Sequence, residues 1–432
     1  MSQERRKELI VSIVLKSVIV AAGITGLLAS FLMTEIGAKN EVLYYTVQSN
    51  IWIWAVMVVC LVLDCVALAK RKEDLIPQWL RMIKFVFTVA ITLTGFVYNF
   101  VLFPASLMSP EPTNPLALDS IFVHIVVPVL SIADFIKFDY RLKVDKKTAL
   151  FGLITPLYYL PFALIAAELG AVYKQGERFP YFFLNHEKLS WFRFKGMPGV
   201  FYWLIIVLGI VLGISYLLLN CHKRRQKSEK IKEFGCFREN YKLNYKKIIK
   251  KGDGLYFDDV CIEDNEGNKV FETESFINTS YGSRTSIARV LSNLYPHKFK
   301  FRGKRVASIE GVLQGIKYKD KKMQNAVLKY AGLDAYHTRG CNVEDFWGKE
   351  GLLYWQGKEI KRESKEYQRF LDELYYCAAA CPLYKKALLS TGDKYLLHHI
   401  GNENTHETVL TRFEYELRMN SLREFLRIEE NK

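Results

Sequence analysis

The residues best suited to chemistry lie in the segment 291–320. If Ser308 caps a helix there, Glu310, Gln314 and Lys317 follow at spacings of four and three residues. Their side chains would then project from one helical face. A carboxylate and an amine on one face can act on a polar substrate, but this spacing is equally typical of a solvated ion-pair stripe. From spacing alone, the stripe is the simpler interpretation.

A second acid, Asp393, follows about eighty residues later in the sequence Thr391-Gly392-Asp393, which ends a predicted helix. We expect Glu310, Lys317 and Asp393 to converge on one pocket.

A separate group of polar residues lies inside apolar runs near the N-terminus. Thr46 and His124 are expected roughly 6 Å and 10 Å below one boundary of a membrane, at 1.5 Å per helical residue. A hydroxyl and an imidazole within hydrogen-bond reach form a nucleophile and its base. Alternatively, Thr46 bonds its own helix and His124 links two helices. Asn50, four residues after Thr46, and Asn99 are expected at the same level.

The polar residues Thr46, Asn50, Asn99 and His124 are positioned by six apolar runs. The last, 200–219, has no charge, is long enough to cross a bilayer, and precedes the basic sequence CHKRRQKSEK. We therefore predict an all-α transmembrane bundle over 1–222. The earlier runs are 9–33, 42–69, 83–103, 117–138 and 149–170.

The charges between these runs predict the orientation. Basic residues cluster on alternate connections, so the positive-inside rule places both termini and the C-terminal domain in the cytoplasm of an integral membrane protein. The loops 34–41, 104–116 and 171–199 would face outward, although the last also contains basic residues. Asp64 and Asp134, near the cytoplasmic span ends, are expected to be solvated at the interface.

The six-span plan has a second implication. With Thr46 and Asn50 opening the second span, His124 and Pro128 in the fourth, and FPYFFLN at 179–185, residues 8–220 resemble the androgen-induced protein family of integral-membrane threonine hydrolases. The resemblance implies a lipid-ester hydrolase with Thr46 as nucleophile and His124 as its partner.

The remaining chain reads as a basic linker at 223–252 and a soluble domain at 253–432. The linker is expected to lie along anionic lipid headgroups, which explains part of the net charge of +15. The domain begins with short strands around a turn at 265–268 and continues with helices. We predict a helix-rich α+β fold, and a multi-domain protein as a whole. The expected helices are 308–319, 321–331, 364–379, 382–390 and 411–428.

Three motifs in this domain occur in one order: SNLYP at 292–296, SIEGVLQGIKY at 308–318 and LLSTGD at 388–393. They resemble the NADAR family of N-glycosidases over about 285–428. Gly311 stands where that family usually has histidine, and the tail 401–423 resembles a phage-type branch.

The NADAR resemblance implies hydrolysis of an N-glycosidic bond to ribose. Glu310 and Asp393 would stabilise the charge at the anomeric carbon and protonate the leaving nitrogen. Lys317 would hold a phosphate or form a Schiff base. The resemblance also implies that the substrate contacts Asn293, Tyr295, Ser308 and Gln314. The implied partners are a nucleotide or ribosyl N-glycoside of the ADP-ribosyl-base or riboflavin-pathway type, and ADP-ribosylated nucleic acid.

We therefore predict a membrane-tethered glycohydrolase without metal or cofactor. The alternative is a membrane sensor or anchor with a non-catalytic nucleotide-binding module. A transporter is disfavoured because the spans lack a strong internal repeat. The eight cysteines contain no C-x-x-C pair and are expected to be reduced.

Overall fold

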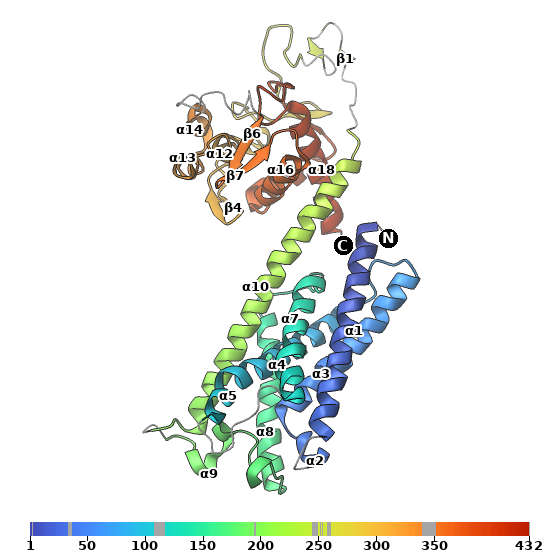
Figure 1. The fold of residues 1–432 in the computed structure, drawn as a ribbon. Helices are drawn as coiled ribbons and strands as arrows, with labels where there is room; N and C mark the ends of the chain where they lie inside the picture. Colours follow the sequence, from blue (N-terminus) through green and yellow to red (C-terminus); the bar gives the residue numbers. More distant parts are fainter. Residues whose placement is uncertain are drawn as a thin grey trace. The chain divides into compact units, whose positions relative to one another are not determined.

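The structure is a computed structural model in which the chain divides into two compact units, Met1–Ser228 and Glu229–Lys432. Figure 1 shows the elements of both. The described residues are 1, 3–32, 37–107, 117–193, 196–243, 249–250, 252, 254–256, 261–338 and 351–431.

The first unit is helical, and its described residues contain six helices that are long and apolar enough to cross a membrane. This confirms the predicted set of six long apolar helices. Each coincides with a mainly apolar run, in which a helix satisfies its backbone hydrogen-bonding groups internally. The spans are Gln3–Leu32, Tyr45–Ala69, Gln78–Ser106, Leu118–Phe138, Thr148–Glu168 and Val200–Asn240.

Some of these spans consist of several helical elements. The third and fourth each contain a π-helical stretch just before a proline, which cannot donate the usual backbone hydrogen bond. The elements in order are α1 (Gln3–Leu32), α2 (Ala38–Glu41), α3 (Tyr45–Ala69), α4 (Gln78–Val97), η1 (Tyr98–Leu102), α5 (Phe103–Ser106), α6 (Leu118–Ile121), η2 (Phe122–Val126), α7 (Val127–Phe138), η3 (Thr148–Leu153), α8 (Ile154–Glu168), η4 (Lys174–Gly176), η5 (Phe182–Leu184), α9 (His186–Leu189) and α10 (Val200–Asn240).

A network of charged side chains lies between α1, α3, α4 and α7. Lys16 Nζ lies 3.0 Å from Asp64 Oδ2 and 3.1 Å from Asp134 Oδ1, and all three side chains are buried. Lys84 contacts the other oxygen of Asp134. The expectation that Asp64 and Asp134 are solvated at the interface is wrong, because lysines from neighbouring helices neutralise both.

The same network continues through Asp139. Its carboxylate lies 2.5 Å from Lys84 and 3.1 Å from Arg81, and its backbone carbonyl accepts a hydrogen bond of 3.1 Å from His222 Nε2. Arg81 also pairs with the less buried Asp74 at 2.6 Å. Three buried cations thus face three buried carboxylates, and this balance keeps charged groups tolerable inside the bundle.

The second unit combines helices with short strands, as the predicted α+β class requires. Within the described part of this unit, the strands form three antiparallel pairs, β1–β2, β4–β5 and β6–β7, and one parallel pair, β3–β8. Its elements after α10 are β1 (Ile249–Lys250), β2 (Leu255–Tyr256), β3 (Phe276–Asn278), α11 (Ser286–Val290), β4 (Phe299–Phe301), β5 (Lys304–Val306), α12 (Ile309–Gly315), α13 (Lys321–Val327), α14 (Gly332–His337), β6 (Leu352–Trp355), β7 (Lys358–Lys361), α16 (Lys365–Ala378), α17 (Pro382–Ser390), β8 (Tyr395–Leu397) and α18 (Arg412–Glu430).

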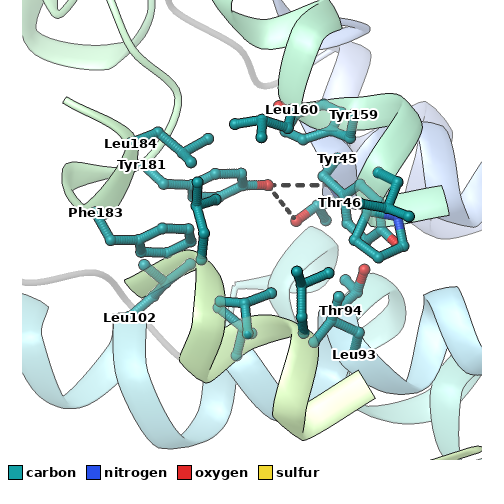
Figure 2. A pocket seen from close by; sticks show the side chains of 16 residues that line it. Tyr45, Thr46, Leu93, Thr94, Leu102, Tyr159, Leu160, Tyr181, Phe183 and Leu184 are labelled. Carbon is teal, nitrogen blue, oxygen red and sulfur yellow. Dashed lines mark hydrogen bonds between the residues drawn. The ribbon is translucent and has the colours of Figure 1, made fainter. Parts of the chain in front are cut away.

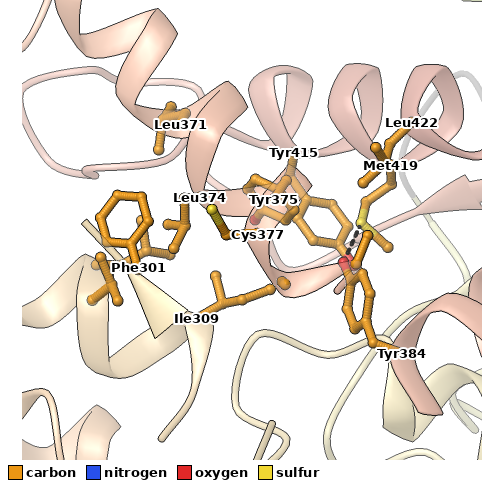
Figure 3. Close-up of a cluster of buried hydrophobic side chains, with 14 of the residues drawn as sticks. Phe301, Ile309, Leu371, Leu374, Tyr375, Cys377, Tyr384, Tyr415, Met419 and Leu422 are labelled. Carbon is orange, nitrogen blue, oxygen red and sulfur yellow. Dashed lines mark hydrogen bonds between the residues drawn. The ribbon is translucent and has the colours of Figure 1, made fainter. Parts of the chain in front are cut away.

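The core of the second unit lies between α12, α16, α17 and α18. Figure 3 shows Ile309 of α12, Tyr375 of α16, Tyr384 of α17 and Met419 of α18 within it, and all four are buried. Helix α18 begins with the predicted capping box, in which Thr411 and Glu414 each bond the other's backbone N–H. These contacts fix the helices on which the polar residues described below are placed.

The boundary between the units differs from the predicted linker 223–252. Helix α10 continues to Asn240, and Phe234 is fully buried in the core of the second unit. Arg238 Nε lies 2.7 Å from Asp372 Oδ1. The end of α10 is therefore part of the second unit, because its apolar and basic side chains have partners there.

Candidate functional site

Helix α12 presents the predicted row of polar side chains. Ser308 caps the helix by accepting a hydrogen bond of 2.9 Å from the Gly311 N–H. Gln314 Nε2 donates to Glu310 Oε1 at 2.6 Å, and Lys317 Nζ donates to Gln314 Oε1 at 2.8 Å. The three residues thus share one face, as their spacing predicts.

This row lines a polar cavity with a volume of about 530 Å³. Other lining residues come from 398–415, which runs from the end of β8 to the first turn of α18. Lys317 and Arg412 supply positive charge, while Glu310 and Glu407 supply negative charge. The cavity therefore suits a polar ligand that has both an anionic part and a part able to face a carboxylate.

His398 lines the same cavity and is a residue that sequence reasoning missed. Its Nδ1 lies 2.6 Å from the Thr279 carbonyl oxygen. A carbonyl only accepts, so Nδ1 has the proton and Nε2 is the nitrogen able to accept one. Burial lowers the pKa of His398, opposed by this hydrogen bond, so the ring is neutral near pH 7.

Neighbouring residues hold His398 in place. Glu416 accepts hydrogen bonds from the His398 backbone N–H at 3.1 Å, from Arg412 at 2.7 Å and from the Tyr395 hydroxyl at 2.9 Å. Burial raises the pKa of Glu416, which the bond from Arg412 opposes. The Tyr415 ring packs against the imidazole at 5.3 Å between centroids. The histidine thus has a fixed backbone, tautomer and ring position.

Of the other predicted binding residues of this unit, only some line the cavity. Asn293 lines the cavity, and its side-chain oxygen accepts a hydrogen bond of 2.9 Å from the Tyr375 hydroxyl. Tyr295 packs against His297, with ring centroids 4.8 Å apart, and does not appear among the lining residues of the described cavity. Ser308 is fully buried in its capping role.

Asp393 is not brought to Glu310. It lies in the loop after α17, as predicted, but its side chain is 89% exposed and its carboxylate accepts a hydrogen bond of 2.9 Å from Arg427. Arg427 lies fifteen residues beyond the cavity residue Arg412, or roughly 22 Å along α18. The predicted convergence of Glu310, Lys317 and Asp393 is therefore wrong, because α17 directs this loop toward the far end of α18.

In the first unit, Thr46 and His124 do not form a pair. Thr46 Oγ1 lies 3.4 Å from the Tyr181 hydroxyl. The His124 ring stacks on Tyr98 with centroids 3.6 Å apart, and its Nδ1 lies 3.2 Å from the Ser120 carbonyl oxygen. Among the described residues, no hydrogen bond joins the threonine to the histidine. The predicted nucleophile thus lacks its predicted base.

Asn50 and Asn99 serve the helices rather than a cavity. Asn50 Nδ2 donates to the carbonyls of Thr46 at 2.9 Å and Val123 at 3.2 Å. Asn99 Nδ2 donates to the carbonyls of Gly95 at 2.7 Å and His124 at 3.2 Å. Pro128 cannot donate to the carbonyl four residues before it, so Asn99 satisfies a group that the proline leaves open.

Comparison with known proteins adds one match. Residues 285–424 match the model of a family described as bacteriophage protein GP30.3. The matched residues include α12, the segment 398–415 that lines the cavity, and most of α18. Searches of curated proteins and of solved structures found no match.

This match overturns both resemblances drawn from the sequence. Neither the NADAR family nor the androgen-induced protein family is supported. The motifs on which these resemblances rest are short. A helical spacing of polar residues can produce the first, and an apolar run that contains a threonine can produce the second, without common ancestry. The comparison therefore shows that the C-terminal part of this chain is similar to the bacteriophage GP30.3 family.

Proposed function

We propose that the second unit is a hydrolase that cleaves an N-glycosidic bond to ribose, attached to a membrane by the first unit. The observation that supports this proposal is the cavity that brings together Glu310, Lys317 and His398. Cleavage of a ribosyl C–N bond develops positive charge at the anomeric carbon, which an adjacent carboxylate stabilises. The substrate class is a nucleotide-like ribosyl N-glycoside, either free or as ADP-ribose on a nucleic-acid base.

The proposed reaction divides among these residues. Glu310 faces the anomeric carbon, and Lys317 pairs with the phosphate of the substrate. His398 Nε2 takes a proton from water, whose oxygen bonds to the anomeric carbon as the C–N bond breaks. That proton then passes to the departing nitrogen, so water is the only co-reactant. Asp393 has no part in this scheme.

The test uses the full chain in detergent with an ADP-ribosylated guanine oligonucleotide and with a ribosylamine of the riboflavin pathway as probes. Release of the free base, detected by mass spectrometry, supports the hydrolase. Binding of a probe without release supports the second candidate, a non-catalytic nucleotide-binding module below a membrane sensor or anchor. That candidate is favoured by Gln314, which already bonds both Glu310 and Lys317.

The ring state of His398 predicts a pH dependence. Its pKa lies below the ordinary 6.5 because burial disfavours the charged ring. The neutral ring is the active form, so the rate should fall only as pH drops below 6.5 and His398 takes up a proton. We expect this acidic limb of kcat/KM to disappear in His398→Gln. An acidic limb above pH 6.5, or one unchanged in His398→Gln, contradicts the assignment.

The proposal also places both termini and the second unit in the cytoplasm, at the plasma or inner membrane. The basic residues Lys223, Arg224 and Arg225 follow the apolar part of α10, where the positive-inside rule expects the cytoplasmic side. We expect an impermeant maleimide to label Glu187→Cys on intact cells. The exposed native Cys261 should react only after lysis. Labelling of Cys261 on intact cells reverses the orientation.

A further inference from the structure

The first unit contains a cavity that no part of the proposed hydrolase uses. It lies between α3, α4, α8 and α10, with a volume of about 120 Å³ (Figure 2). Its walls are largely apolar and include Leu93, Leu102, Leu160 and Phe183. Apolar cavities of about this size stay dry and accept small apolar molecules such as benzene. The lining therefore selects a hydrocarbon rather than a polar solute.

Most hydroxyl groups around this cavity already have close partners. The Tyr45 hydroxyl lies 2.9 Å from Thr155 Oγ1, and the Tyr159 hydroxyl donates to the Leu43 carbonyl at 2.9 Å. Thr94 Oγ1 lies 2.7 Å from Ser49 Oγ. These groups bond within the bundle, and a ligand would meet the apolar parts of their side chains.

The pair formed by Thr46 and Tyr181 is different. The Tyr181 hydroxyl lies 3.4 Å from Thr46 Oγ1 and accepts from the Thr46 N–H at 3.3 Å. Hydroxyl–hydroxyl bonds are usually about 2.5–3.0 Å long and N–H···O bonds about 2.7–3.2 Å, so both contacts are longer than usual. Figure 2 shows the two hydroxyls pointing toward one another at the cavity. They can exchange these long contacts for shorter ones to a ligand oxygen.

The position of the cavity indicates where its ligand comes from. All four surrounding helices belong to candidate membrane spans. Leu157 lines the cavity and is also 52% exposed on the outside of the unit, so one wall reaches the surface that would face lipid. A chain of a membrane lipid can therefore enter without crossing water.

We propose that this cavity binds the carboxyl-end segment of the acyl chain of a membrane lipid, with the carboxyl or ester oxygen at Thr46 and Tyr181 and the rest of the chain in the bilayer beyond Leu157. The site is one of binding rather than cleavage, because His124 stacks on Tyr98 and does not bond Thr46. The proposal is independent of the hydrolase, which concerns the other unit.

Photolabelling of the full chain tests this proposal. The protein is reconstituted in phosphatidylcholine nanodiscs that contain phosphatidylcholine with a diazirine on its acyl chain, or a diazirine fatty acid in a second arm. We expect adducts on cavity residues such as Leu160 and Leu93. Labelling by the phospholipid or only by the fatty acid supports an acyl ligand and distinguishes its two sources.

Matched substitutions on α8 provide the control. Leu160→Trp fills the cavity and should abolish the adduct on Leu93, whereas Ile154→Trp, at a position 51% exposed on the same helix, should keep it. Leu204→Phe narrows the cavity if Leu160→Trp does not fold, as judged by gel filtration. Adducts confined to exposed positions, or cavity adducts that survive both cavity-filling variants, overturn the proposal.

Discussion

Replacing Glu310 with glutamine is expected to lower the turnover of a ribosyl N-glycoside by about 10² or more, the scale of a lost electrostatic contact in a transition state. The amide keeps the shape of the carboxylate and can still accept the hydrogen bond from Gln314. It has no negative charge with which to stabilise the anomeric carbon. Substrate affinity should therefore change far less than kcat, as single-turnover rates and equilibrium binding to the full chain would measure.

Two substitutions serve as controls for this result. Glu359→Gln removes an exposed carboxylate on β7, away from the cavity lining, and should leave turnover unchanged. Asp393→Asn tests whether Asp393 is catalytic. The sequence predicts a catalytic acid at this position and therefore a loss of turnover. The structure pairs Asp393 with Arg427, so we expect turnover to stay unchanged. Turnover that is equal in Glu310→Gln and the wild type would remove the carboxylate from the mechanism.

The part of this site that could be predicted from the sequence is local. Glu310, Gln314 and Lys317 lie on one face because the helical period alone decides it. The relation of Asp393 and His398 to that face depends on how α17, β8 and α18 pack. The parallel pairing of β3 with β8, with Ile277 opposite Leu396, is one such non-local contact. No local sequence pattern predicts this pairing, because over a hundred residues separate the two strands.

The six long apolar helices of the described chain were predictable for a different reason. A long, mainly apolar run satisfies its backbone groups in hydrocarbon only as a helix, so composition alone predicts that the helix exists. Composition does not predict which helices pack against one another. Lys16 and Lys84 lie inside the first and third spans, and only the arrangement of the bundle shows that Asp134 lies between them. The interpretation of Asp134 as a solvated interface residue failed on this point.

The same arrangement predicts that neutralising Asp134 will destabilise the first unit strongly. Asp134→Asn leaves Lys16 and Lys84 buried with three cations against two carboxylates. Removing one partner of a buried ion pair costs about 3–5 kcal/mol, because the remaining charge stays uncompensated. We expect a loss of this size in unfolding of the full chain in detergent, followed by circular dichroism.

A double substitution separates charge balance from packing. Lys84→Met with Asp134→Leu removes one charge of each sign and leaves the pairs Lys16–Asp64 and Arg81–Asp139, so it should be more stable than Asp134→Asn alone. The exposed pair of Arg178 and Glu187 is the comparison, since Glu187→Gln should cost at most about 1 kcal/mol. If the double variant is no more stable than Asp134→Asn, shape rather than charge balance holds this part of the bundle together.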